Sequence, residues 1–144
     1  MHPLTILIAS TFSGLALAAA CTGDKSIAGY CTTLTLLDRT NPSVSPSTSQ
    51  CQDTCAAVLQ DPSDWNVDFA GKPDGYRQPM LGHDCGFSVS RGDGEPANLR
   101  FSMRNQDILD IIDEAVNRFG GANGRVGAEG TMNCEGHIAK WYID

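Results

Sequence analysis

Hydrophobic residues recur at helical spacing in one long segment, residues 105–119. In NQDILDIIDEAVNRF the apolar side chains are Ile108, Ile111, Ile112, Ala115, Val116 and Phe119. This spacing places them in one stripe on a helix of 3.6 residues per turn. We expect Asn105 to cap the N-terminus of this helix, and Gly120 and Gly121 to end it.

The remaining positions of the same helix are mostly polar: Asp107, Asp110, Asp113, Glu114, Asn117 and Arg118. We expect these side chains to face water while the apolar stripe covers a sheet. Asp107 and Asp110 also place negative charge near the positive end of the helix dipole.

A second, shorter helix is predicted for residues 50–59, with Ser49 as its N-cap. Residues four apart are neighbours on a helix, so one face would carry Cys51, Cys55, Val58 and Leu59. A bond between the two cysteines along one helical turn is not expected. Each should instead connect this helix to a different neighbour.

Alternation of apolar and polar positions predicts the strands. They are residues 29–37, 65–69, 85–90, 99–103, 125–134 and 137–143. Gly127 and Gly130 suggest a bulge or a close approach of two backbones. Glu135 and Gly136 suggest a tight hairpin turn.

Segments 38–50 and 71–82 combine Ser, Thr, Pro or Gly and are expected to be surface loops. The element order is then β-α-β-β-β-α-β-β. This order predicts an α+β domain, an antiparallel sheet with two helices packed on one face, in a ferredoxin-like sandwich with an extra hairpin.

Residues 1–20 have the pattern of a secretory signal peptide. Residues 4–20 carry no charge, and alanines at 16, 18 and 20 supply an A-x-A-like cleavage site. A membrane span and a lipoprotein signal ending at Cys21 are the alternatives; the short run lacks basic flanks for either. We therefore expect residues 21–144 to form a single domain of an extracellular protein.

Six cysteines remain after such a cleavage: Cys21, Cys31, Cys51, Cys55, Cys85 and Cys134. An even number in a short secreted chain indicates three disulfides, and the 15 possible pairings stay open. A metal site is not expected, because there is no C-x2-C pair and His83 and His137 are not spaced like zinc ligands. We expect no cofactor.

The formal net charge is −7, which disfavours binding to nucleic acid backbones. Acid–base chemistry would have to use His83 or His137 with a carboxylate such as Glu129 or Glu135. No catalytic motif accompanies these residues, so a small hydrolase or ribonuclease is an alternative hypothesis only.

Candidate surface contacts are few. Arg91, Gly92 and Asp93 spell the integrin-recognition tripeptide at an expected hairpin tip, although turn chemistry alone produces such a sequence. Tyr76 and Arg77 lie in the Gly/Pro-rich loop. Trp65 and Trp141 fall on faces expected to point inward, where core packing is the simpler interpretation.

The stretches DPSDWNVDF, MRNQDILDIIDEAVNRFGG and AEGTMNCEGHIAKWY, with the Cys51–Cys55 spacing, resemble small secreted cysteine-rich proteins of filamentous fungi, many of them candidate effectors. The order of elements is also similar to the disulfide-stapled sandwich of the smut-fungus killer toxins. This resemblance implies a non-enzymatic protein that binds a host or extracellular protein or glycan. We expect a monomer that uses loops 38–50 and 71–82 as contact regions, because binding sites usually lie in loops on a rigid scaffold. A killer-toxin-like or antimicrobial role is a further alternative, although the acidic charge disfavours anionic membranes.

The signal peptide and the disulfide framework can be tested together. Protein collected from culture medium and analysed by intact mass spectrometry without reductant should begin at Cys21 and lack two hydrogens for each of three disulfides. Retained residues 1–20, or alkylation of thiols before reduction, would contradict this prediction.

Overall fold

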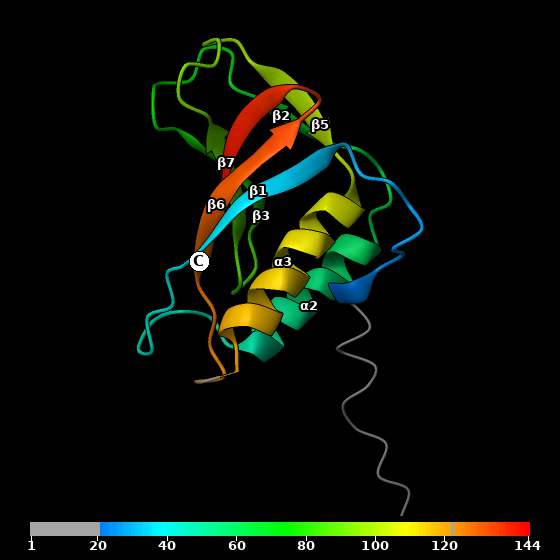
Figure 1. Ribbon diagram of the computed structural model, residues 1–144, viewed down its shortest axis with the longest axis vertical. Helices are drawn as coiled ribbons and strands as arrows, with labels where there is room; N and C mark the ends of the chain where they lie inside the picture. The colour runs from blue at the N-terminus through cyan, green and yellow to red at the C-terminus, as the bar shows by residue number, and fades with distance from the viewer. Residues whose placement is uncertain (1–20, 122) are drawn as a thin grey trace, which may run out of the picture.

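The computed structural model describes residues 21–121 and 123–144, so the predicted signal peptide lies outside the described residues. The elements, in chain order, are β1 (Cys31–Asp38), α2 (Thr48–Leu59), β2 (Trp65–Asp68), β3 (Arg77–Leu81), β4 (Phe87–Arg91), β5 (Arg100–Met103), α3 (Asn105–Phe119), β6 (Ala128–Cys134) and β7 (His137–Ile143). Figure 1 shows α2 and α3 side by side against the sheet. The α+β class, with an antiparallel sheet and two helices on one face, is confirmed.

The strands form two sheets. A five-stranded sheet has the order β1-β6-β7-β4-β3, and a two-stranded sheet pairs β2 with β5. β2 and β5 are far apart in the chain, so their pairing forms a separate small sheet and not the extra hairpin that was expected. Gln78 of β3 joins the sheets: Asp68 N–H donates to its Oε1 (3.0 Å), and its Nε2 donates to the Asn66 carbonyl (2.9 Å).

The apolar stripe of α3 is part of the core. Ile108, Ile111, Ile112 and Ala115 are almost completely inaccessible to solvent, and Val116 and Phe119 pack at the margin of the core. The N-cap is Arg104 rather than Asn105, so the expected start was wrong by one residue. Gly120 forms the C-cap, as expected.

The opposite side of α3 is not wholly polar surface, contrary to expectation. Gln106, Asp107 and Leu109 are buried, at 2 %, 4 % and 0 % exposure. The reason is an N-terminal arm, residues 21–30, that lies against them. The Asp24 N–H donates to Gln106 Oε1 (2.8 Å), and Lys25 Nζ lies 2.5 Å from Asp110 Oδ1.

Asp107 connects this arm to the helix. Its carboxylate accepts hydrogen bonds from three backbone N–H groups, those of Tyr30 (3.0 Å), Cys31 (3.1 Å) and Arg104 (2.7 Å). Burial raises the pKa of Asp107, and the three N–H groups oppose that rise because they stabilise the ionised form. One carboxylate thus fixes the start of α3 against the start of β1.

The second helix begins earlier than expected. Ser47, not Ser49, is the N-cap; its Oγ accepts from Gln50 N–H (3.1 Å), while Gln50 Oε1 accepts from Ser47 N–H (2.8 Å). This reciprocal capping box satisfies two N–H groups at the helix start. Leu59, expected on the buried face, is 38 % exposed because the helix ends there.

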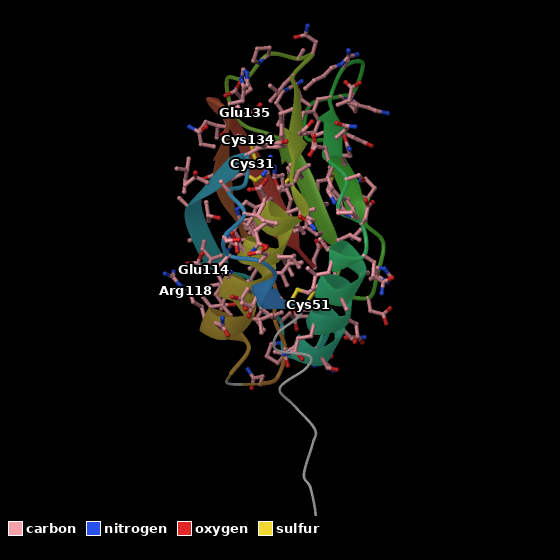
Figure 2. All side chains as sticks on the ribbon, turned by 90° about the vertical axis from the view of Figure 1, so that its right-hand side faces the viewer. Cys31, Cys51, Glu114, Arg118, Cys134 and Glu135 are labelled. Atoms are coloured by element: carbon pink, nitrogen blue, oxygen red, sulfur yellow. A yellow bond between two sulfur atoms is a disulfide. The ribbon has the colours of Figure 1, made fainter. Side chains whose placement is uncertain are left out.

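All six cysteines form disulfides: Cys21–Cys55, Cys31–Cys134 and Cys51–Cys85. The two cysteines of α2 do connect to different neighbours, the N-terminal arm and the segment before β4. The third bridge joins β1 to the end of β6, and its two cysteines lie together in Figure 2. A bridge that closes so long a loop restricts the unfolded chain strongly.

The segment expected to be an irregular loop, 71–82, contains strand β3. Pro79 masked this strand, because proline cannot donate to a sheet ladder. The position is tolerated since β3 is an edge strand and Pro79 pairs with Ser88 of β4.

Strand β1 carries a bulge between Thr33 and Thr35. Leu34 is the extra residue. Odd-numbered residues point to one face of the sheet before the bulge and to the other face after it. The expected close approach is at Gly130 on the partner strand, where a Cβ would clash with the Thr35 carbonyl and the Trp141 ring.

The β6–β7 turn has a residue in the left-handed region. Glu135 has φ 55° and Gly136 has φ 94°, the pattern of a two-residue hairpin turn, as expected. The Asn133 side chain accepts a hydrogen bond from Gly136 N–H (2.8 Å). Glutamate at the first position is costly, because side chains other than Gly, Asn and Asp rarely adopt this conformation.

Removing the Asp107 carboxylate should destabilise the fold. Asp107→Ala leaves its N–H donors buried without an acceptor, which should lower the free energy of unfolding by at least about 2 kcal/mol. The control is Asp110→Ala on the exposed side of α3, which should cost less than about 1 kcal/mol. Urea unfolding measures both, and equal effects would contradict the prediction.

The pH dependence of Asp107→Asn gives an independent check. Because the pKa of Asp107 is raised, the folded protein keeps this proton at a pH where the unfolded chain has lost it. Wild type should therefore gain stability relative to Asp107→Asn as pH falls from above the folded pKa toward the ordinary aspartate value. A slope of the opposite sign would contradict the raised pKa.

The strained turn residue also allows a test. Glu135→Asn should raise the free energy of unfolding by about 0.5 kcal/mol or more, because asparagine tolerates the left-handed conformation in a hairpin turn. Glu135→Val, which introduces a β-branched side chain, should lower it. Denaturant midpoints that move in the reverse order would show that the turn is not strained.

Candidate functional site

One face of the five-stranded sheet is left without helices, and we call it the open face. Along β7, Ala139, Trp141 and Ile143 point into the core, whereas Lys140 and Tyr142 point to the other side and are partly exposed. The same alternation on β6 sends Glu129 and Thr131 outward. Thr35 and Leu37 of β1 and Arg77 of β3 lie on the same side. We use the name open face for these seven residues: Thr35, Leu37, Arg77, Glu129, Thr131, Lys140 and Tyr142.

A shallow groove of about 240 Å³ crosses the open face. It is lined by Thr35, Leu37, Glu129, Gly130, Thr131, Lys140 and Tyr142. Side chains from β1, β6 and β7 therefore meet in one concave surface. The β1 bulge lies at its side, between Thr33 and Thr35.

Hydrogen bonds hold the side chains of the open face in place. The hydroxyls of Thr35 and Thr131 are 2.8 Å apart, and those of Ser90 and Tyr142 are 3.0 Å apart. The Arg77 guanidinium stacks on the Tyr142 ring, 3.5 Å from its centroid. Such a cation–π contact orders an exposed arginine and covers one side of the ring.

Charges on and around the open face are paired. Arg39 lies 2.7 Å from Glu129, Lys140 lies 2.8 Å from Asp93, and Arg77 lies 3.0 Å from Asp144. The hydrogen bond to Asp93 raises the pKa of Lys140. Since these pairs balance, the open face is neutral in a chain whose net charge is −7.

Exposed apolar side chains border the open face on β1. Leu34 and Leu37 are each 52 % exposed. The other large exposed apolar side chains in the described residues are Ile27, Val44 and Leu59, which lie outside the sheet. No strand lies beyond β1 in the order of the sheet, so both leucines border a free sheet edge.

The expected surface contacts are divided between two places. Arg77 belongs to the open face, and Asp93 reaches its edge through Lys140. Tyr76 packs against the margin of the core, with Lys72 Nζ 5.0 Å from its ring centroid.

The Arg91-Gly92-Asp93 tripeptide does not lie at a hairpin tip. Arg91 is the last residue of β4 and pairs with Ala139 of β7. Its side chain is only 15 % exposed, forms an ion pair with Asp74 and donates to the Ala97 carbonyl (3.0 Å). Gly92 N–H donates to the Ile138 carbonyl (2.9 Å), so the sheet extends to Gly92, whereas Asp93 lies in the turn that follows and its side chain is exposed.

The two histidines considered for acid–base chemistry, His83 and His137, lie apart. His137 begins β7, while His83 precedes β4, whose Phe87 pairs with the far end of β7. His137 Nδ1 is 3.0 Å from Glu95 Oε2, not from Glu129 or Glu135. Glu95 also accepts from Ile138 N–H (2.7 Å); that bond, with the contact to His137, lowers the pKa of Glu95. His83 lines a small hollow with Gln50, Asp53 and Asp84.

Two further properties concern only the described residues. Within residues 21–121 and 123–144, no three His, Cys, Asp or Glu side chains are placed to hold a metal ion. In the same residues, neither helix combines the length and hydropathy that a membrane span requires.

Residues 30–134 match the family model described as "Hce2: Pathogen effector; putative necrosis-inducing factor". The match covers well over half of the chain, and the protein therefore belongs to this family of pathogen effectors. No curated protein matches the chain. The resemblance to effector proteins noted in the sequence is confirmed; the likeness to killer toxins stays a prediction.

Sequence reasoning missed most of the open face. It located contact residues in loops, because loops carry binding sites more often than sheets do. Alternation predicted the strands at 125–134 and 137–143, but it was not used to select their outward residues, Lys140 and Tyr142 among them. The missing information was that both helices cover the other face.

Proposed function

We propose that this protein is exported, loses residues 1–20, and acts outside the producing cell as an effector that binds a protein of the host. The role we propose involves contact rather than catalysis. Membership of a pathogen effector family and the complete pairing of the six cysteines support this proposal. Disulfides persist in oxidising compartments such as the extracellular space.

The open face carries the proposal. Its side chains are ordered by hydrogen bonds, ion pairs and the Arg77–Tyr142 stack before any partner arrives. Binding costs less conformational entropy when the contacting groups are already held in place. The charge distribution also limits the partner. The surface around the neutral open face is acidic, so it repels acidic proteins and favours partners that are neutral or basic.

The size of the groove also fits contact with a protein side chain. A volume of about 240 Å³ lies below the usual range of small-molecule pockets, roughly 300–1,000 Å³. An anchoring side chain inserted there would be bordered by the apolar Leu37 and by the hydroxyls of Thr35 and Thr131. Interfaces commonly place one such anchor in a central pocket.

A pull-down from host extracellular fluid tests the proposal. The variant Lys140→Glu, Tyr142→Ser reverses one charge and removes the stacked ring without touching the core. Proteins retained by wild type should be retained at least tenfold less by this variant, because two groove-lining side chains are lost. Quantitative mass spectrometry of the eluates measures the difference.

The matched control lies on the helix side of the molecule. Glu114→Ala, Arg118→Ala removes an exposed ion pair of α3, whose two residues are labelled in Figure 2. This variant should retain the same proteins as wild type. If the open-face variant and the control behave alike, or if wild type enriches no protein, the proposed binding role fails.

A further inference from the structure

Strand β1 is an edge strand with little of the usual protection. Native edge strands avoid pairing with other chains through charged side chains, prolines, bulges or short length. β1 runs over eight residues, and residues 31–37 (CTTLTLL) contain neither a charge nor a proline. Of the usual devices it has the bulge and one charge at its end, Asp38; the bulge leaves residues 35–38 as a regular stretch in register with β6.

The other edge of the sheet is partly occupied. On β3, the Gln78 side chain bonds to the backbone of β2 at Asn66 and Asp68. This side-chain amide links β3 to the two-stranded sheet. Among the described residues, β1 is therefore the long edge that the fold leaves open.

The side chains next to this edge suit an added strand. Successive residues of a strand point to opposite faces, so a strand beside β1 would place every second side chain over the open face. There it would meet Leu37 and the groove, while its backbone would pair with β1. The exposed Leu34 supplies a second apolar contact at the bulge.

Charge indicates the kind of strand. The chain has a net charge of −7, the edge itself is neutral, and β1 ends in an exposed Asp38. A segment with an uncharged aliphatic centre would match the neutral edge, and basic residues at its ends would match Asp38 and the net negative charge. A second copy of this chain matches less well, because each copy would bring its own −7.

We propose that an extended segment of the partner protein, aliphatic in its centre and flanked by Lys or Arg, adds to the sheet along β1. This inference rests on the proposed function and names the manner of binding at the same site. Backbone hydrogen bonds would supply affinity, and alternate side chains in the groove would supply specificity.

A synthetic probe tests the geometry directly. The peptide Ac-KTVTVTVTK-NH2 should bind, and binding should slow amide hydrogen exchange in residues 32–37. Methylation of alternate peptide nitrogens, which removes edge hydrogen bonds, should weaken binding at least tenfold. Replacing the two lysines of the peptide by glutamate should also weaken binding at least tenfold at low salt. Equal binding of the methylated peptide, protection elsewhere, or no binding at millimolar peptide would overturn the proposal.

Substitutions in the protein separate this inference from the proposed function. Leu34→Lys places a charge beside the edge at a residue that does not line the groove, and it should weaken the peptide complex at least tenfold. Ile27→Lys, another exposed apolar residue but outside the sheet, is the control and should bind as wild type does. Thermal melts confirm that each variant is folded.

The pull-down then distinguishes the two possible failures. If the β1 variant loses the proteins that wild type retains, strand addition is supported. If it keeps them while the Lys140→Glu, Tyr142→Ser variant loses them, strand addition is overturned and binding through the open face stands. If both variants keep these proteins, strand addition and binding through the open face are both overturned.

Discussion

A single buried carboxylate determines how the first part of the chain meets the long helix. Asp107 accepts three backbone N–H groups that belong to the N-cap of α3, to the end of the N-terminal arm and to the first residue of β1. Leaving such donors unsatisfied in a buried place is costly. The edge strand, the arm and the helix therefore have one mutual arrangement, and the position of β1 in the sheet follows from it.

The covalent framework lies on the inner side of the molecule. The cysteines of the three bridges are buried or packed against the core, and α2 takes part in two of the bridges. Helices, disulfides and core thus occupy one side of the sheet. The side chains of the open face lie outside this core, so a substitution there leaves the buried contacts and the bridges in place.

Local pattern predicted the parts of this structure that depend on neighbouring residues. The stripe of α3, the cysteine face of α2 and the Glu135-Gly136 turn follow from spacing within a few residues. Asp107, Gln78 and the β1 bulge do not, because each acts on a segment distant in sequence. Asp107 has the sequence context of a surface helix residue, and only the arm that covers it makes it a buried acceptor. The open face was missed for the same reason.

The range of the family match has a consequence for protein engineering. It ends at Cys134, one residue before the turn that leads into β7. Yet β7 is the middle strand of the five, with β6 on one side and β4 on the other, and it carries the fully buried Trp141. A recombinant fragment cut to the matched boundaries would keep every cysteine bridge that starts at or after residue 31 and still lack the strand that makes the sheet continuous.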